Sequence, residues 1–252
     1  MTAIYPDLNG KTVLVTGGAS GIGAAIVRAF AAQGAHVGFF DIDRAEGEAL
    51  ESELSGLGQT ARFFAVDITD IAALRKGIAD LRSALGPIAI LINNAARDDR
   101  HPALDVTPED FDALMAVNFR HQFFASQAVI EDMRGLGGGS IICMSSISWL
   151  AGFGGMPLYT AAKAGILGLV KSLARDFGPD DIRVNAISPG WIMTERQIEK
   201  WLTPEADAMR EDRQALKRRL MPDDIARLAL FLCSEDASAI TGQNHIADGG
   251  WI

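Results

Sequence analysis

Lys11-Thr-Val-Leu-Val-Thr-Gly-Gly-Ala-Ser-Gly-Ile-Gly23 predicts a β-strand, a glycine-rich turn and the start of an α-helix, in that order. Apolar residues continue at helical spacing after the turn, at Ile26 and Phe30. Such a turn allows close backbone approach, and the helix N-terminus offers free N–H groups to a diphosphate. Because the spacing is G-x-x-x-G-x-G rather than G-x-G-x-x-G, the turn by itself also fits a purely structural bend.

The same alternation of strand and helix continues towards the C-terminus. Further strands are expected at His36–Asp41, Thr60–Asp67, Ile88–Ile92, Ser140–Ser145, Arg183–Ser188 and Asn244–Ala247. Repeated units of this length predict an α/β fold with a doubly wound parallel sheet and right-handed crossovers. No internal repeat or low-complexity linker divides the chain, so we expect one dinucleotide-binding and catalytic domain over residues 1–252.

Residues 191–221 break this alternation. The segment carries a basic run made of Arg210, Arg213, Lys217, Arg218 and Arg219. Such a run usually forms a solvated helix face. An insertion between a strand end and the next helix is also where a substrate lid would lie, so we expect a lid here.

Composition argues against several partners. The chain has 252 residues, a 48% hydrophobic share and a formal net charge of −9. That charge disfavours nucleic acid or an anionic membrane surface, and no apolar run is long enough to span a bilayer. The N-terminal residues lack a signal-peptide pattern, and Cys143 and Cys233 fit inert buried thiols, so we expect a cytoplasmic protein. The four histidines show no metal-ligand spacing, so we expect no metal.

Several strand ends carry candidate cofactor contacts. Asp41 lies 18 positions beyond Gly23, where a carboxylate bonds the ribose hydroxyls of adenosine and repels a 2′-phosphate. NAD is therefore favoured over NADP, although Arg44 would attract such a phosphate and Asp41 also fits a helix cap. Asp67 and Ile68 are candidate adenine contacts, with a helix cap as the alternative role of Asp67. Asn93-Asn-Ala-Ala96 offers small groups that can lie against a flat ligand.

Tyr159, Lys163 and Ser146 form the candidate reaction centre. Residues four apart share a helix face, so the Tyr159 phenol and the Lys163 ammonium can reach one site. A nearby cation favours the phenolate, which would make Tyr159 a usable acid/base group near neutral pH. Ser146 follows an apolar strand at its carboxyl end, where open α/β sheets bind ligands. By themselves these three residues could also be coincidental, since each type is common.

Taken together, these motifs resemble those of the short-chain dehydrogenase/reductase family. The resemblance rests on Thr16–Gly23, Asn93–Ala96, Ser146, Tyr159-x-x-x-Lys163 and Pro189-Gly190, and it extends from Lys11 to the C-terminus. It implies a Rossmann fold with seven parallel strands and helices on both faces, usually assembled as a homotetramer that pairs through two helices. One departure is Ala96, where most members have Gly.

The resemblance also implies roles for individual residues. The catalytic tetrad falls on Asn118, Ser146, Tyr159 and Lys163: Tyr159 is the acid/base, Ser146 holds the substrate oxygen, Lys163 binds the nicotinamide ribose and lowers the Tyr159 pKa, and Asn118 holds a water. The NAD contacts fall on Gly17, Ser20, Gly21, Ile22, Gly23, Asp41, Ile42, Asp67, Ile68, Asn94, Ala95, Ala96, Tyr159, Lys163, Pro189, Gly190, Ile192 and Thr194.

A weaker resemblance points to bacterial NAD-dependent aldose 1-dehydrogenases of the D-xylose and L-arabinose type. It rests on Asp98–His101, Ser146–Trp149 and the region from Arg196 to Glu205. It implies oxidation of the anomeric carbon of a pyranose to a lactone. Sugars need donors, acceptors and an aromatic ring for their apolar face. The candidate substrate residues are Asp98, Arg100, His101, Ser146, Ser148, Trp149, Tyr159, Trp191 and Arg196.

Two other functions fit the sequence. The first is NAD-linked oxidation of a secondary alcohol on a 2-keto-3-deoxy sugar acid, with Arg196 or the basic run binding the carboxylate. The second is a non-catalytic nucleotide-binding scaffold, which the intact tetrad argues against. Both readings keep a small-molecule ligand as the partner of this chain.

Overall fold

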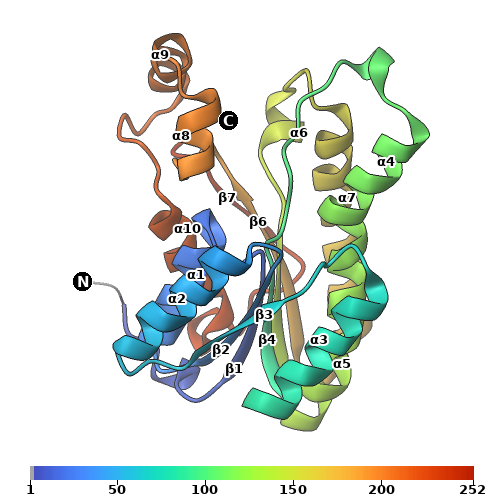
Figure 1. Cartoon of the computed structure of the whole chain (residues 1–252), viewed down its shortest axis with the longest axis vertical. Coiled ribbons are helices and arrows are strands. Elements are labelled where there is room, and N and C mark those ends of the chain that lie inside the picture. Colours follow the sequence, from blue (N-terminus) through green and yellow to red (C-terminus); the bar gives the residue numbers. More distant parts are fainter. Residues whose placement is uncertain (1–2) are drawn as a thin grey trace.

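The computed structural model describes residues 3–252, so the first two residues of the domain expected over 1–252 lie outside the described part. Seven parallel strands form one sheet in the order β3-β2-β1-β4-β5-β6-β7 (Figure 1). They are β1 (Thr12–Thr16), β2 (His36–Asp41), β3 (Ala61–Ala65), β4 (Ile88–Asn93), β5 (Gly139–Met144), β6 (Ile182–Pro189) and β7 (Asn244–Ala247). The expected doubly wound parallel sheet of seven strands is confirmed.

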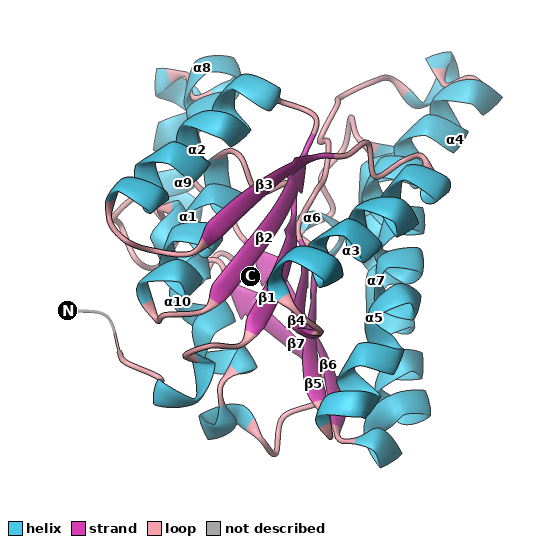
Figure 2. Ribbon diagram, turned by 60° about the horizontal axis from the view of Figure 1, so that its bottom comes forward, coloured by secondary structure: helices cyan, strands magenta, loops and turns pink. Residues whose placement is uncertain are grey.

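Helices cover both faces of this sheet (Figure 2). One face packs against α1 (Gly21–Ala32), α2 (Arg44–Gly56) and α10 (Pro222–Cys233), and the other against α3 (Ile71–Leu85), α5 (His121–Leu136) and α7 (Pro157–Phe177). Shorter helices are α4 (Pro108–Met115), α6 (Ser148–Ala151), α8 (Glu195–Trp201) and α9 (Pro204–Arg213). A π-helical turn, Ala116–Arg120, joins α4 to α5, and single 3-10 turns lie at Pro6–Leu8, Ala103–Asp105, Gly178–Asp180 and Glu235–Ala237.

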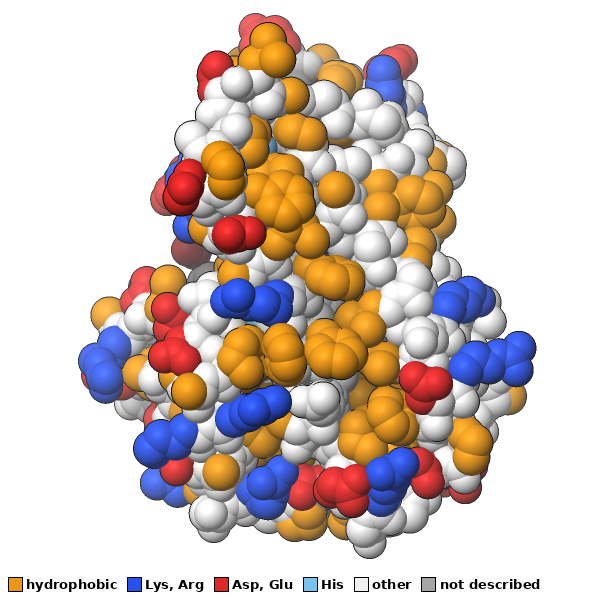
Figure 3. Space-filling model, turned by 90° about the vertical axis from the view of Figure 1, so that its right-hand side faces the viewer, with side chains coloured by type: hydrophobic (Ala, Val, Ile, Leu, Met, Phe, Trp, Pro, Cys, Tyr) orange, Lys and Arg blue, Asp and Glu red, His pale blue; other side chains and the backbone are white. Residues whose placement is uncertain are grey.

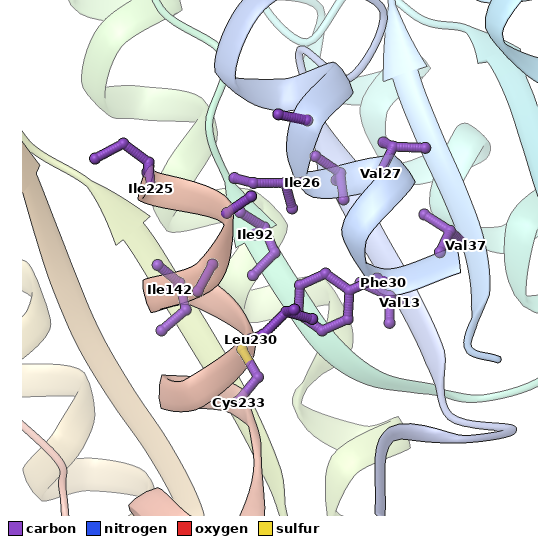
Figure 4. Close-up of a cluster of buried hydrophobic side chains, with 14 of the residues drawn as sticks. Val13, Ile26, Val27, Phe30, Val37, Ile92, Ile142, Ile225, Leu230 and Cys233 are labelled. Atoms are coloured by element: carbon purple, nitrogen blue, oxygen red, sulfur yellow. The ribbon is translucent and has the colours of Figure 1, made fainter. Parts of the chain in front are cut away.

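Strand β1 shows how the sequence produces two buried faces. Alternate side chains of a strand point to opposite sides, and a parallel sheet covered by helices buries both. Val13 and Val15 therefore pack into the core beneath α1 and α10, whereas Leu14 packs into the core beneath α3, α5 and α7. Figure 4 shows Phe30 of α1 and Leu230 of α10 meeting over the strands in the first of these cores.

The order of the strands fixes where a ligand can bind. β1 pairs with β2 on one side and with β4 on the other, so the direction of chain progress reverses between β1 and β4. Open α/β sheets bind ligands outside the carboxyl ends of the strands at this point. The glycine turn after β1 and the Asn94–Ala96 segment after β4 meet there, because the Asn94 amide donates to the Gly17 carbonyl at 2.8 Å.

The surface over α3, α4, α5 and α7 carries apolar side chains near its centre (Figure 3). Phe111 of α4 is 47% exposed and Phe123 of α5 is 38% exposed. Within residues 3–252, none of the helices is both long and apolar enough to cross a membrane. In the same range, no His, Cys, Asp and Glu side chains gather in a group that could hold a metal ion.

Candidate active site

Three candidate catalytic side chains line one cavity of about 450 Å³ at the carboxyl end of the sheet. Tyr159 lies in the first turn of α7, which begins at Pro157, and Lys163 follows one turn later. Ser146 comes two residues after the end of β5. A strand end and a helix start thus bring together residues that lie up to 17 positions apart in the sequence.

Hydrogen bonds orient two of these groups. The Ser146 hydroxyl oxygen accepts from the Ser148 backbone N–H at 3.1 Å, so its own proton can be donated towards Tyr159 or a ligand. The Lys163 side chain is 1% exposed, and its Nζ donates to the Met144 carbonyl at 2.7 Å. The Lys163 nitrogen lies 5.5 Å from the centre of the Tyr159 ring.

Burial dominates the titration of this pair. It raises the pKa of Tyr159 to about 12, against the lowering effect of a hydrogen bond with Ser146, and the negative charge of Asp98 adds to the rise. Burial also lowers the pKa of Lys163 to about 7. The sequence led us to expect a lowered Tyr159 pKa. The geometry differs from that expectation because the Lys163 ammonium is itself desolvated and donates to Met144.

Asn118 lies in the π-helical turn rather than in a regular helix. Its Oδ1 accepts from the Arg97 N–H at 2.9 Å, and its Nδ2 donates to the carbonyls of Arg97 and Leu114, each at 3.0 Å. The side chain therefore fixes the segment after β4 against the helix. Single π turns inside helices are frequent at functional sites, because the widened turn redirects the backbone. The Asn118 carbonyl accepts from Gln122 at 3.3 Å.

The glycine turn has the shape of a diphosphate cradle. A Cβ at Gly23 would overlap the Gly17 carbonyl oxygen, and a Cβ at Gly17 would come within 2.7 Å of the Ala95 Cα. Gly17 and Gly21 also have positive φ values of 65° and 54°. Ser20 is the N-cap of α1 without forming a side-chain cap, and Ile22 lies in the first turn. This turn fits the diphosphate of a dinucleotide, which needs close backbone approach at a helix N-terminus.

Asp41 closes β2 beside this cradle. One carboxylate oxygen accepts from the Ala19 N–H at 3.0 Å, and the other accepts from the Ile42 N–H at 2.8 Å. These bonds fix the carboxylate beside the glycine turn and leave further lone pairs for ribose hydroxyls. Further along this edge, the Asp67 carboxylate accepts from Thr69, and the neighbouring Ile68 is buried.

The other candidate cofactor residues lie on the opposite side of the cradle. Asn94, Ala96, Pro189, Gly190 and Ile192 line the same cavity as Tyr159. Thr194 caps α8, where its Oγ1 accepts from the Gln197 N–H, and its methyl group faces Gly21. The cradle and the reaction centre are therefore continuous along the carboxyl edge of the sheet.

The structure brings most candidate substrate residues to this cavity. Asp98, Arg100, Ser148, Trp191 and Arg196 line it together with Ser146 and Tyr159. His101 and Trp149 are not among the residues that line it. The His101 backbone instead donates to the Gly155 carbonyl at 2.8 Å and joins two surface loops. Sequence motifs place residues in the right loop without fixing the direction of each side chain.

Comparison with known proteins gives the family of this chain. Residues 17–252 match the sequence profile described as "Enoyl-(Acyl carrier protein) reductase". The chain is 49% identical to a protein named "Probable galactose dehydrogenase" from Rhizobium meliloti, over 98% of this chain and 96% of that one. It is 46% identical to a D-xylose 1-dehydrogenase from Caulobacter vibrioides, over 99% of each. A short-chain dehydrogenase/reductase structure from Serratia marcescens superposes with a TM-score of 0.91 at 34% identity, covering 97% of this chain and 99% of that one. This chain belongs to the short-chain dehydrogenase/reductase family.

The motifs that suggested the short-chain dehydrogenase/reductase family therefore identified it correctly, and the protein is a dehydrogenase. Its cavity is also lined by residues outside the candidate site set, namely Met144, Ser145, Ile147, Phe153, Gly154, Met156, Gln197, Trp201, Ala206, Met209 and Trp251. Trp251 reaches the cavity from the C-terminus and packs edge-on against Phe153, with ring centres 6.0 Å apart. No local signal marks Trp251, because only the return of the chain beyond β7 brings it there.

Residues 191–221 of this short-chain dehydrogenase/reductase, where the sequence predicts a lid, form α8, α9 and the loops around them. Its basic run is not a solvated helix face throughout, because α9 ends at Arg213. Arg210 is 3% exposed and bonds Asp207 at 2.7 Å, and Arg219 bonds the same carboxylate. Arg218 bonds Asp224 of α10. These arginines tie parts of the 191–221 segment to one another and to α10.

Proposed function

We propose that this dehydrogenase oxidises the anomeric carbon of a neutral aldose, a pentose or hexose, to its lactone, with NAD as the oxidant. The observation that carries the proposal is the composition of the cavity around Tyr159. It combines the carboxylate of Asp98, the amide of Gln197 and the indoles of Trp191 and Trp201. Carboxylates and amides bind hydroxyl groups, and indole rings stack on the apolar face of a sugar.

The charge balance of the cavity supports a neutral substrate. Arg196, one candidate for binding the carboxylate of a sugar acid, binds Asp98 at 3.1 Å and Asp99 at 3.2 Å. Its positive charge is therefore already compensated inside the protein. The names of the two relatives, a galactose dehydrogenase and a D-xylose 1-dehydrogenase, agree with an aldose.

The chemistry assigns one task to each catalytic residue. Ser146 donates its hydroxyl proton to the C1 oxygen and holds it in place. Tyr159 as phenolate takes the proton of the C1 hydroxyl, while the C1–H bond breaks and the C1=O bond of the lactone forms. NAD, when bound, accepts the hydride from C1. Lys163 contributes positive charge beside the phenol and the nicotinamide ribose below its pKa of about 7.

NAD is favoured over NADP by the carboxylate at the end of β2. Asp41 would accept hydrogen bonds from the adenosine ribose and repel a 2′-phosphate. Arg44, the nearest candidate for binding that phosphate, pairs with Glu48 at 3.3 Å on the exposed side of α2. The diphosphate would lie on Gly17–Gly23, the adenine near Asp67 and Ile68, and the carboxamide near Ile192 and Thr194.

The alternative is oxidation of a 2-keto-3-deoxy sugar acid. One observation supports this alternative. Arg100 lines the cavity and forms no ion pair within the described residues. Its guanidinium lies 3.8 Å from the centre of the Trp201 ring. Under this alternative Arg100, rather than Arg196, would bind the carboxylate.

We also expect a cytoplasmic homotetramer, and sedimentation of the purified protein tests the assembly.

The decisive experiment measures NAD reduction with D-galactose, D-xylose, their methyl glycosides and a 2-keto-3-deoxy sugar acid. We expect activity with at least one free aldose, none with its methyl glycoside, and a lactone that hydroxylamine traps. Blocking the anomeric oxygen removes the proton that Tyr159 must take. Activity with the sugar acid and with none of the aldoses would contradict the proposal. Complete inactivity with every alcohol would instead favour the nucleotide-binding scaffold.

A further inference from the structure

A chain of hydrogen bonds crosses one wall of the substrate cavity. The Trp191 indole Nε1 donates to the Gln197 Oε1 at 2.9 Å, and the Gln197 Nε2 donates to the Asp98 Oδ2 at 2.7 Å. Arg196 binds the other oxygen of Asp98 at 3.1 Å. The lid residues after β6 are thereby tied to the segment after β4, nearly a hundred positions earlier in the chain.

The chemistry of the end groups fixes the direction of this chain. An indole N–H can only donate, so the amide oxygen of Gln197 must face Trp191 and its NH₂ group must face Asp98. A guanidinium can also only donate. Both oxygens of Asp98 therefore accept, and the carboxylate has only acceptor capacity left for a ligand.

Asp98 is placed to use that capacity on a substrate. Its side chain lines the cavity with Ser146 and Tyr159 and is 20% exposed. Its negative charge contributes to the raised pKa of Tyr159, which agrees with a position close to the reaction centre. A ligand group that faces Asp98 must donate a hydrogen bond, so hydroxyl groups fit and carboxylates or phosphates are repelled.

We propose that Gln197 is a positioning residue that holds Asp98 as a fixed acceptor for substrate hydroxyl groups, and that this pair selects polyhydroxylated neutral substrates over anionic ones. The inference deepens the proposed function and rests on it. Gln197 acts through Asp98 and does not itself take part in proton or hydride transfer. Fixing the acceptor before the substrate arrives reduces the ordering cost of binding.

Two substitutions separate the bonds from the packing. Gln197→Met keeps the length of the side chain and removes both hydrogen bonds. Gln197→Glu keeps the acceptor for Trp191 and places a second carboxylate against Asp98. Adding Asp98→Asn to Gln197→Glu restores a hydrogen bond between the two positions, because the new amide at position 98 can donate to the new carboxylate at position 197. Lys200→Met is the matched control, because Lys200 is exposed on the same helix and does not line the cavity.

The test measures KM and kcat for D-galactose, together with its dissociation constant by tryptophan fluorescence. We expect Gln197→Met to raise KM about tenfold, and Gln197→Glu about a hundredfold, because a hydrogen bond to a charged group is lost or reversed. kcat and the KM for NAD should stay within about threefold, as expected for loss of uniform substrate binding. The double variant should reverse part of the KM increase that Gln197→Glu causes. Lys200→Met should match the wild type.

Each outcome decides the inference. An unchanged KM in Gln197→Met overturns it while the aldose function stands. If the wild type binds D-galactose without oxidising it, and Gln197→Met weakens that binding, the proposed function fails and the positioning role stands. If the wild type neither binds nor oxidises D-galactose or D-xylose, both fail.

D-galacturonate, which carries a carboxylate in place of the C6 alcohol, should bind at least about tenfold more weakly than D-galactose. Equal or tighter binding overturns the proposed selection against anions.

Discussion

The Lys163 ammonium nitrogen lies 5.5 Å from the centre of the Tyr159 ring, yet it donates its hydrogen bond to the Met144 carbonyl. The two residues share a helix face as their spacing predicts. Both are desolvated, so burial raises the pKa of the phenol to about 12 and lowers the pKa of the amine to about 7. Between these values the pair is favoured in its neutral form. Forming the phenolate is therefore the demanding proton step of the proposed reaction.

Replacing Tyr159 by Phe should abolish turnover, because the phenol oxygen is the group that takes the substrate proton. The ring packing survives, so NAD affinity should stay within about threefold of the wild type. Steady-state NAD reduction and a fluorescence titration with NAD measure the two effects. Retention of even a tenth of wild-type activity would exclude Tyr159 as the acid/base.

The rate of aldose oxidation should rise with pH. Only the phenolate accepts a proton, and with a Tyr159 pKa of about 12 its fraction increases roughly tenfold per pH unit across the neutral and mildly alkaline range. Asp98→Asn removes a negative charge that raises this pKa, so its kcat profile at saturating sugar should move to lower pH. A profile that is flat in the wild type, or that moves to higher pH in the variant, contradicts this assignment.

Asp41→Ala should weaken NAD and admit NADP. The substitution removes the ribose hydrogen bonds and the repulsion of a 2′-phosphate together. The measurement is kcat/KM for both cofactors with one sugar. Asp43→Ala is a nearby control, since Asp43 caps α2 through the Glu46 N–H. If the Asp41→Ala variant still prefers NAD by more than about tenfold, the Asp41 carboxylate does not set the choice of cofactor and serves only the turn.

Stability should fall in acid because of His121, which is fully buried beneath the active site. Burial, followed by the charge of Lys163, lowers its pKa from 6.5 to about 3. The unfolded chain therefore binds this proton first, and stability is lost as pH falls from about 6.5 towards 3, at about 1.4 kcal/mol per pH unit. Urea unfolding at several pH values measures the slope. His121→Leu should lower the slope by about 1.4 kcal/mol per pH unit, the contribution of one proton. An unchanged slope would contradict the prediction.

Gly23→Ala should destroy the diphosphate cradle. The added Cβ overlaps the Gly17 carbonyl and comes within 2.7 Å of the Asn94 amide, so the backbone must move. We expect NAD binding to be lost and the free energy of unfolding to fall by about 1–3 kcal/mol. Gly135→Ala is the control, because its Cβ would meet nothing within 4 Å. That substitution lies in α5 and should stabilise the protein slightly. Normal NAD affinity in Gly23→Ala would exclude the cradle role.

The fold, the family and the candidate catalytic residues could all be predicted from the amino-acid sequence. The signals that allow this are local: apolar runs of strand length, a glycine turn, and the four-residue spacing of Tyr159 and Lys163. Local backbone geometry is enough to predict a strand, a turn or a shared helix face from each of them. The glycine requirement at position 23 is equally local, since it follows from the tight turn back towards Gly17.

The composition of the cavity around Tyr159 and the pKa values of its groups, in contrast, depend on the tertiary structure. Gln197 and Trp201 come from the segment after β6 and Trp251 comes from the C-terminus, and they line the same cavity as Asp98 across separations that no periodicity encodes. The same holds for Arg196, whose charge is compensated by Asp98 and Asp99 in another loop. The pKa values of Tyr159 and Lys163 depend on desolvation by the whole surrounding fold, which is why the spacing predicted their proximity but not the direction of the Tyr159 shift.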